Sequence, residues 1–370
     1  MTSEPADYGL SKQVRSAKVP APELPYLPRM PKRYRPKLGL VGAGGVSEYH
    51  LRAYQKLGLE VVAICDLNLE RARSRRDQFC PNATVCDDFQ ELRRRDDIEV
   101  IDVAVHPEHR ISLIEAALAA GKHVLSQKPL ALDLDVAERL ADLADKHEVK
   151  LAVNQNGRWA PHFAYALAAV REGLLGEIGS VDFNLSFDHS WTIGTPFENL
   201  HHLILYDFGV HWFDLAACLL GRRQLVSIYA SVVRASYQKA RPPFLASALI
   251  DADGAQVRMS FNAAVTFGQV DRTLIAGSLG TLESTGPSLS EQRVVLTTAA
   301  GTSSPDLVGT WFENGFQGTM CELLCAVEEK REPSNSARNN LGTLALCFAA
   351  LSSANTRQPI RPGTVRKLPD

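Results

Sequence analysis

The stretch that decides the fold is Lys37–Asp66, with the sequence KLGLVGAGGVSEYHLRAYQKLGLEVVAICD. An apolar run at Leu38–Val41 predicts a buried strand, and the apolar spacing of Ser47–Leu57 predicts a helix. A second apolar run, Val61–Cys65, ends in Asp66. A strand, a glycine turn, a helix, a second strand and an acidic residue in this order are typical of a dinucleotide-binding unit.

The glycine turn has the residues that a pyrophosphate requires. Gly42 permits the tight turn, and Gly44 lets the backbone approach phosphates that the N–H groups at the start of the helix would bind. Asp66 lies about twenty residues further on, where a carboxylate would accept hydrogen bonds from the adenosine ribose. A glycine turn in an α/β domain that binds no nucleotide is the alternative. The predicted nucleotide ligands of this unit are Gly42, Gly44, Gly45, Val46 and Asp66.

Strands and helices go on alternating as far as residue 153, which predicts an α/β domain with a doubly wound parallel sheet. In such sheets, ligands bind beyond the carboxyl ends of the strands. The residues that follow the predicted strands should therefore meet in one crevice. Besides the glycine turn and Asp66, these residues are His106, Gln127, Lys128, Asn156 and Arg158.

The pattern changes near residue 160, where apolar and polar residues begin to alternate. This alternation predicts antiparallel strands with one covered face, for example at Val181–Phe187. Helical spacing occurs at Leu203–Leu220, Thr319–Lys330 and Leu341–Ser352. We therefore expect a C-terminal α+β domain with a mainly antiparallel sheet. The expected division is an N-terminal arm at 1–36, the dinucleotide-binding domain at 37–157 and the substrate domain at 158–370.

The segment 1–36 carries seven prolines and shows no periodicity, which predicts an extended or disordered arm. Tyr26, Leu27 and Met30 would dock this arm on a groove or on a neighbouring subunit. A loose tail is the alternative.

The composition excludes several classes of partner. The 370 residues carry a net charge of −2, which gives no sign of a nucleic-acid or anionic-membrane partner. No apolar run reaches the length of a membrane span, and the N-terminus lacks the apolar segment of a secretory signal. The seven cysteines are scattered without a CxxC pair, which suits a reducing compartment. We therefore expect a cytoplasmic protein with no nucleic-acid or membrane partner.

Three residues have the chemistry of an alcohol–carbonyl hydride transfer. Asp207 and His211 are four residues apart on one face of a predicted helix, where the carboxylate would orient a histidine that exchanges protons near neutral pH. Lys128 follows a strand end beside the nucleotide crevice, where its ammonium would stabilise developing alkoxide charge. A metal site with His201 and His202 is an alternative, but no tight ligand motif is present and we expect no metal.

Several motifs together carry a family resemblance: Gly42-Ala43-Gly44-Gly45, Ala119–Val124 leading to Lys128-Pro129, Arg158 with Pro161, and Asp207-x-Gly209-x-His211-x-x-Asp214. By these motifs, residues 37–370 resemble the Gfo/Idh/MocA oxidoreductases, which include inositol and sugar dehydrogenases. The resemblance implies a Rossmann domain followed by an open-faced antiparallel sheet. It also implies a homo-oligomer that associates through that sheet.

The resemblance assigns roles to the catalytic residues. His211 would be the acid/base, Lys128 would bind the reacting hydroxyl, and Asp207 would position the substrate or His211. Gln127 replaces the usual Glu of the lysine motif, which removes a negative charge beside Lys128. The predicted substrate ligands are Lys128, Asn156, Asp207 and His211, and the predicted cofactor ligands are Gly42, Gly44, Gly45, Val46, Asp66, His106, Gln127, Lys128 and Arg158.

Asp66 favours NAD as cofactor because a carboxylate repels the 2′-phosphate of NADP, whereas Arg71 in the next helix would favour NADP. By resemblance the substrate is a sugar or polyol, such as an aldose, a branched pentose such as apiose, or an inositol. A non-catalytic NAD(P)-binding regulator is one alternative, although such a protein would not need all three catalytic residues. An NADPH-dependent reductase of a dihydrodiol, anhydrofructose or biliverdin-like substrate is the other, and cofactor preference separates it from the first interpretation.

Overall fold

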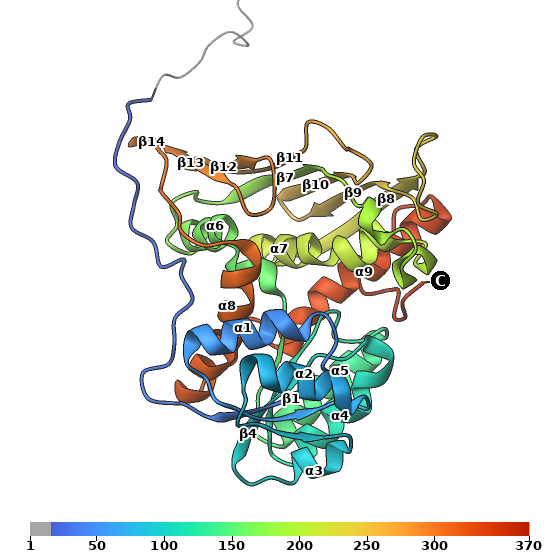
Figure 1. The fold of residues 1–370 in the computed structure, drawn as a ribbon. Coiled ribbons are helices and arrows are strands. Elements are labelled where there is room, and N and C mark those ends of the chain that lie inside the picture. The colour runs from blue at the N-terminus through green and yellow to red at the C-terminus, as the bar shows by residue number, and fades with distance from the viewer. Residues whose placement is uncertain (1–15, 370) are drawn as a thin grey trace, which may run out of the picture.

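A computed structural model describes residues 16–369 of the chain (Figure 1). The first sheet is wholly parallel, with the strand order β3-β2-β1-β4-β5-β6. This order confirms the predicted doubly wound sheet. The three-residue strand β3 was not predicted, because it is too short for its pattern to be recognised. The strands are β1 (Lys37–Val41), β2 (Val61–Cys65), β3 (Thr84–Cys86), β4 (Ile98–Val103), β5 (His123–Ser126) and β6 (Leu151–Val153).

Helices cover both faces of this sheet, and they come from both halves of the chain. The buried side chains of α1 share a core with Phe316, Met320 and Leu323 of α8, and the core on the other face includes α4, α5 and α9. The C-terminal helices therefore complete the core of the N-terminal sheet. The bounds are α1 (Ser47–Leu57), α2 (Leu69–Phe79), α3 (Phe89–Arg93), α4 (Pro107–Ala119), α5 (Leu134–Lys146), α8 (Trp311–Glu328) and α9 (Ala337–Thr356).

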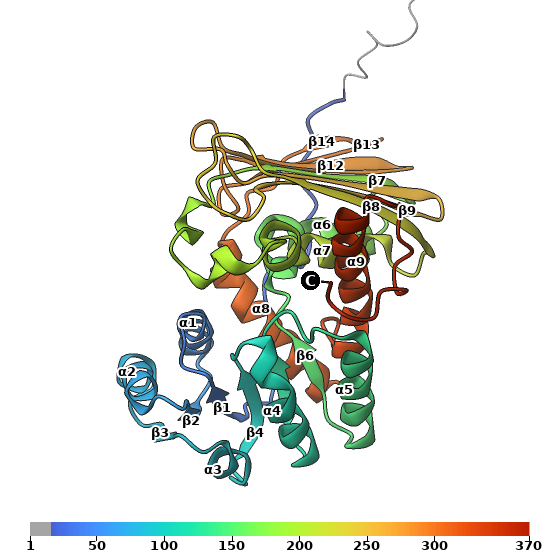
Figure 2. The same cartoon turned by 90° about the vertical axis from the view of Figure 1, so that its right-hand side faces the viewer.

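The second sheet has eight strands in the order β14-β13-β12-β11-β7-β10-β9-β8. All neighbours are antiparallel except β7 and β10, which confirms the predicted mainly antiparallel sheet. Helices α6 (Pro161–Arg171), α7 (Val210–Leu220) and α9 lie under one face, and within residues 16–369 the opposite face carries no helix (Figure 2). The strands are β7 (Ile178–Ser186), β8 (Leu225–Val233), β9 (Leu245–Ala252), β10 (Ala255–Asn262), β11 (Val270–Gly277), β12 (Gly280–Gly286), β13 (Arg293–Thr298) and β14 (Gly301–Ser303).

Three of the predicted helix bounds were wrong, and each difference has a local cause. Helix α8 begins eight residues before the predicted start, at a cap where the Thr310 side chain accepts from the N–H of Glu313. Gly318 lies inside this helix because a Cβ there would come within 2.1 Å of the Trp159 ring. Helix α9 begins after a similar cap at Ser336. The predicted helix 203–220 is a π-helical turn, η4 (Ile204–Phe208), followed by α7.

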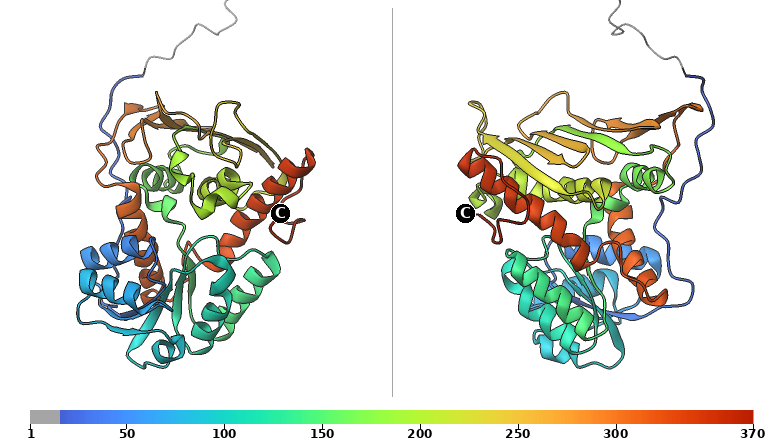
Figure 3. Two further views of the ribbon diagram at one scale, coloured as in Figure 1. Left: turned by 45° about the vertical axis from the view of Figure 1, so that its right-hand side comes forward. Right: turned by 180° about the vertical axis from the view of Figure 1, so that it is seen from behind.

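Residues 16–36 of the proline-rich arm run along the outside of the molecule from β14 to β1 (Figure 3). Near β14, the N–H of Val19 donates to the carbonyl of Thr302 at 3.0 Å. Further along, Tyr165 Oη donates to the carbonyl of Pro22 at 3.1 Å. The Glu328 carboxylate then accepts from the backbone N–H groups of 32, 33 and 34. The arm therefore docks on its own chain over this range, while positions 1–15 lie outside the described residues.

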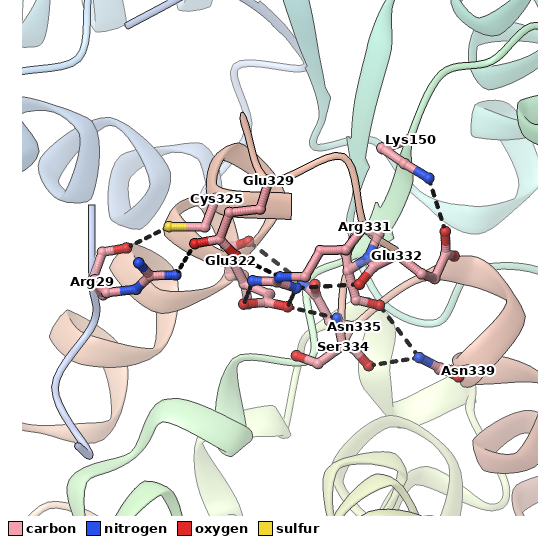
Figure 4. Close-up of polar contacts among 12 residues, drawn as sticks. Arg29, Lys150, Glu322, Cys325, Glu329, Arg331, Glu332, Ser334, Asn335 and Asn339 are labelled. Atoms are coloured by element: carbon pink, nitrogen blue, oxygen red, sulfur yellow. Dashed lines mark hydrogen bonds and ion pairs between the residues drawn. The ribbon is translucent and has the colours of Figure 1, made fainter. Parts of the chain in front are cut away.

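Polar contacts at the end of α8 join the arm to both domains (Figure 4). The Arg331 guanidinium binds the Glu322 carboxylate at 2.6 and 3.1 Å. Arg29 of the arm pairs with Glu329, and Asn335 Nδ2 donates to the carbonyl of Val153 at the end of β6 at 3.0 Å. These contacts hold the α8–α9 connection against the first sheet.

Candidate active site

The glycine turn after β1 has the geometry of a phosphate cradle. Gly42 has a φ of 95°, and a Cβ there would come within 2.6 Å of the carbonyl oxygen of Ala104. A Cβ on Gly44 or Gly45 would meet nothing within 4 Å, so the surface of the turn is open. Within residues 16–369, no acceptor is bound to the N–H groups of Gly44, Gly45 and Val46. These free donors at the start of α1 suit an anionic pyrophosphate.

Asp66 lies at the end of β2 beside this turn. Its Oδ2 accepts from the N–H of Ala43 at 2.7 Å, and its Oδ1 accepts from the N–H of Asn68 at 2.8 Å. Both bonds come from the backbone, which fixes the carboxylate and leaves further lone pairs for ribose hydroxyls. Arg71 is exposed, and the described part of the chain gives its guanidinium no ion pair.

Arg75 of α2 is a residue of the cofactor crevice that sequence reasoning missed. Its Nη2 donates to the carbonyl of Gly44 at 3.4 Å, and its Nη1 lies 3.0 Å from Glu48 Oε2 in the first turn of α1. The helix has four arginines and little apolar content, so nothing in the pattern distinguishes Arg75 from its neighbours. His106, which was predicted, caps α4 at the end of β4 and is exposed.

Lys128 and Asp207 form an ion pair that joins the two domains. Lys128 follows β5 of the first sheet, and its Nζ lies 3.0 Å from Asp207 Oδ1 and 2.8 Å from the Asp207 carbonyl oxygen in η4. Burial alone would raise the pKa of Asp207, but the Lys128 ammonium outweighs burial and the pKa is lowered. The structure therefore brings together two of the three predicted catalytic residues.

His211 lies in the first turn of α7, directly after this pair. Burial, assisted by the positive charge of Lys128, lowers the pKa of His211 to about 3, so the ring is uncharged at neutral pH. Its Nδ1 is buried and has no partner within the described residues. No hydrogen bond joins it to Asp207 there, because the π-helical turn ends between them with the N–H of Gly209 bound to the carbonyl of Ile204 at 2.7 Å. The predicted orientation of His211 by a bond from Asp207 is therefore not seen.

A series of buried hydrogen bonds holds the backbone of Lys128 in place. Gln127 Oε1 accepts from the backbone N–H of Lys128 at 2.8 Å and from Asn154 Nδ2 at 3.0 Å. The other Nδ2 hydrogen of Asn154 faces His50 Nε2 at 3.3 Å. Gln127 thus keeps the acceptor that the usual Glu would offer, without the charge.

This chain of hydrogen bonds ends on Asp102, the fifth of the six residues of β4. His50 Nδ1 lies 2.7 Å from Asp102 Oδ2, and Tyr54 Oη donates to the same oxygen at 2.6 Å. Because the Asp102 carboxylate can only accept, it favours a hydrogen on Nδ1 of the His50 ring. The Nε2 of His50 is then free to accept from Asn154. Sequence reasoning missed these residues. Two signals were available: His50 and Tyr54 lie four apart on the buried side of α1, and Asp102 interrupts the apolar run 100–105.

The structure gives Arg158 a different role from the predicted one. Its Nε and Nη2 bind the two oxygens of Asp214 at 2.5 and 2.6 Å, and its Nη1 donates to the carbonyl of Ser334 at 2.5 Å. Thr343 also donates to Asp214, at 2.8 Å. All three nitrogens of the guanidinium are therefore used inside the protein, and the geometry does not support Arg158 as a cofactor ligand.

Asn156, which was predicted to bind substrate, is 5% exposed, and its Oδ1 accepts from the indole N–H of Trp311 at 3.1 Å. His202 lies away from the catalytic residues, with its Nε2 2.7 Å from Asn355 Oδ1. Across residues 16–369, no group of three or more His, Cys, Asp or Glu side chains is placed to hold a metal ion. Over the same range, no helix is long and apolar enough to cross a membrane.

Two family models match the chain. The model described as "Oxidoreductase family, NAD-binding Rossmann fold" matches residues 37–155, and the GFO/IDH/MocA C-terminal domain matches residues 163–283. These matches confirm the predicted family and the NAD-binding class of the first domain.

Relatives and solved structures agree with these matches. A D-apiose dehydrogenase of Paraburkholderia graminis is 28% identical over 86% of this chain and 87% of its own. An inositol 2-dehydrogenase of Rhizobium meliloti is 26% identical over 88% of this chain and 98% of its own. An Agrobacterium radiobacter oxidoreductase, solved with NAD+, L-tartaric acid and magnesium, has a TM-score of 0.80 at 23% identity over 89% of this chain and 99% of its own. That likeness confirms the fold.

Proposed function

Since this chain belongs to the Gfo/Idh/MocA oxidoreductase family, we propose that it is an NAD-dependent dehydrogenase of a sugar or polyol. The observation that carries the proposal is the Lys128–Asp207 ion pair, which lies where the nucleotide-binding domain meets the helices of the second domain. The candidate substrates are aldoses, branched pentoses such as apiose, and inositols. Relatives named as apiose and inositol dehydrogenases support this class.

The residues of the glycine turn fit the cofactor. The free N–H groups of Gly44, Gly45 and Val46 would hold the pyrophosphate, and the Asp66 carboxylate would accept from the adenosine ribose. The same carboxylate would repel the 2′-phosphate of NADP, which favours NAD. When bound, NAD supplies the hydride chemistry, and the protein supplies position and proton transfer.

Lys128 is the residue that stabilises the reacting oxygen. Its ammonium, held by the Asp207 carboxylate and carbonyl, would donate to the substrate hydroxyl and favour the alkoxide that forms as the hydride leaves. His211 would take the hydroxyl proton during oxidation and return it during reduction. A histidine with a pKa of about 3 is a weak base, so the transfer depends on Lys128 making the hydroxyl more acidic.

We also propose a cytoplasmic homo-oligomer. The uncovered face of the eight-stranded sheet exposes Tyr229 and Val233 of β8, which a second copy would cover. All seven cysteines are free thiols, which suits a reducing compartment.

The test is the absorbance of reduced nicotinamide with purified protein, NAD or NADP, and a panel of D-apiose, aldoses and inositols. We expect turnover with NAD, its abolition in Lys128→Ala and its retention in Lys150→Ala, a control whose lysine pairs with Glu332 at 3.2 Å. Turnover that survives in Lys128→Ala would contradict the catalytic assignment. A preference for NADP would favour a reductase, and NAD binding without turnover on any panel member would favour a regulator.

A further inference from the structure

A cavity of about 210 Å³ lies where β7 ends and β11 begins, and Phe208 of η4 is one of its lining residues. It has several times the ~30 Å³ that one water molecule occupies in the liquid. Its walls are mostly apolar, with two phenylalanine rings stacked at a centroid distance of 4.4 Å. The main lining residues are Leu185, Phe187, Phe208, Asp271, Pro287 and Leu289.

Asp271 is an unpartnered carboxylate in this apolar setting. It is 4% exposed, lies opposite Leu185 in the sheet register, and belongs to the buried face of β11. Its Oδ2 has no hydrogen-bond partner in the part of the chain that the structure describes, and neither has Thr273 Oγ1, two residues on along the same face. The nearby amide of Gln292 donates instead to the Asp271 backbone carbonyl, at 3.5 Å, and to Ser288.

Within residues 16–369, no positive charge compensates this carboxylate. No Lys, Arg or His of that range lines the cavity, and burial is the sole cause that raises the pKa of Asp271 to about 7. An unpaired buried carboxylate opposes folding unless it is protonated or meets a cation. The cavity beside it has room for such a cation, and the faces of Phe187 and Phe208 would favour one further.

We propose that this cavity binds a small organic molecule through a protonated primary amine, with Asp271 as its counter-ion. A primary ammonium has three donors, and the free Oδ2 of Asp271 is an acceptor for one of them at the cavity wall. The carbon skeleton would lie against Phe187 and Phe208. The proposal is independent of the proposed dehydrogenase activity, because it uses neither Lys128 nor the nucleotide crevice.

The experiment is calorimetric titration of the full chain with 2-aminoethanol hydrochloride near pH 8, in a buffer without amines, and with ethylene glycol as the neutral analogue. We expect binding of 2-aminoethanol, no binding of ethylene glycol, and at least a tenfold loss of affinity (an order-of-magnitude figure) in Asp271→Asn. Asp253→Asn is the matched control, because it makes the same change at an exposed hairpin.

A measurement on the unmodified protein makes the result independent of any variant's folding. Because protons compete for Asp271, affinity should fall by about tenfold or more between pH 8 and about pH 5.5. Absence of binding near pH 8, equal binding by Asp271→Asn, or equal binding of ethylene glycol would each overturn the proposal.

Discussion

Two buried aspartates in two strands have opposite surroundings. Asp102 in β4 is fully buried, and its Oδ2 is bound by His50 and Tyr54. Asp271 in β11 is almost as buried, but its Oδ2 has no donor among residues 16–369. The first carboxylate ends a chain of hydrogen bonds that leads to Lys128, and the second faces a cavity. Asp102 Oδ1 is likewise buried without a partner among the described residues, so the contrast lies in the donors that reach Asp102 Oδ2 and in the cavity that Asp271 lines.

The largest expected effect comes from removing the hydrogen-bonded aspartate, Asp102. Asp102→Ala leaves His50 and Tyr54 without their acceptor inside the core, so we expect the free energy of unfolding to fall by about 3–5 kcal/mol. Urea unfolding measures the loss. Asp97→Ala is the matched control, because Asp97 is an exposed acid of the same domain, paired with Arg95 at 2.8 Å. Equal losses of unfolding free energy in both variants would show that the buried hydrogen bonds of Asp102 contribute no more than an exposed ion pair.

The second effect has the opposite sign. Asp271→Asn should stabilise the protein at neutral pH by roughly 2–4 kcal/mol, since it removes an unpaired charge from the interior. Because burial raises the pKa of Asp271 from 3.8 to about 7, the cost of ionisation is absent below 3.8 and fully present above about 7. The gain should therefore appear as the pH rises through this window. Urea unfolding at several pH values, with Asp253→Asn in parallel, measures this gain in the free energy of unfolding. A gain that stays constant with pH would contradict the account.

The smallest effect concerns the link between the buried chain and Lys128. Gln127→Glu keeps an acceptor for the Lys128 backbone N–H and for Asn154, so we expect turnover to change by less than about tenfold. Gln127→Leu, which removes the acceptor, should lower turnover more than Gln127→Glu. Equal effects of the two variants would mean that the acceptor does not position Lys128.

Much of the fold was predictable because its signals are local. The strands and the helix of residues 37–66 have their own periodicity. Helix α1 and strand β2 form at the predicted residues, and β1 begins one residue before the predicted start. The start of α8 was not predictable in this way. Gly315 and Gly318 weaken the helical pattern, and only the packing of this helix against Asn156 and Trp159 explains them.

In the candidate site too, local motifs predicted some residues, and contacts between distant positions were not predictable. Lys128, Asp207 and His211 were proposed from motifs, and the structure brings Lys128 and Asp207 within 3.0 Å of each other. Arg158 was assigned to the cofactor because it follows a predicted strand. Its partner Asp214 lies 56 positions away, a pairing that spacing does not reveal. Asp271 was not among the predicted site residues, because an acid in an alternating strand is normally expected on the solvent side.

The measurement that tests the central claim most directly is single-turnover reduction of NAD by a sugar or polyol substrate from the panel, catalysed by the protein and by Lys128→Met. Cofactor binding is followed separately by fluorescence. If the Lys128–Asp207 pair stabilises the reacting oxygen, the variant should bind NAD with an affinity within about threefold of the unmodified protein and lose roughly 10³-fold or more in the rate of hydride transfer. A rate within about tenfold of the unmodified protein, with cofactor binding intact, would contradict the assignment of this pair as the catalytic centre.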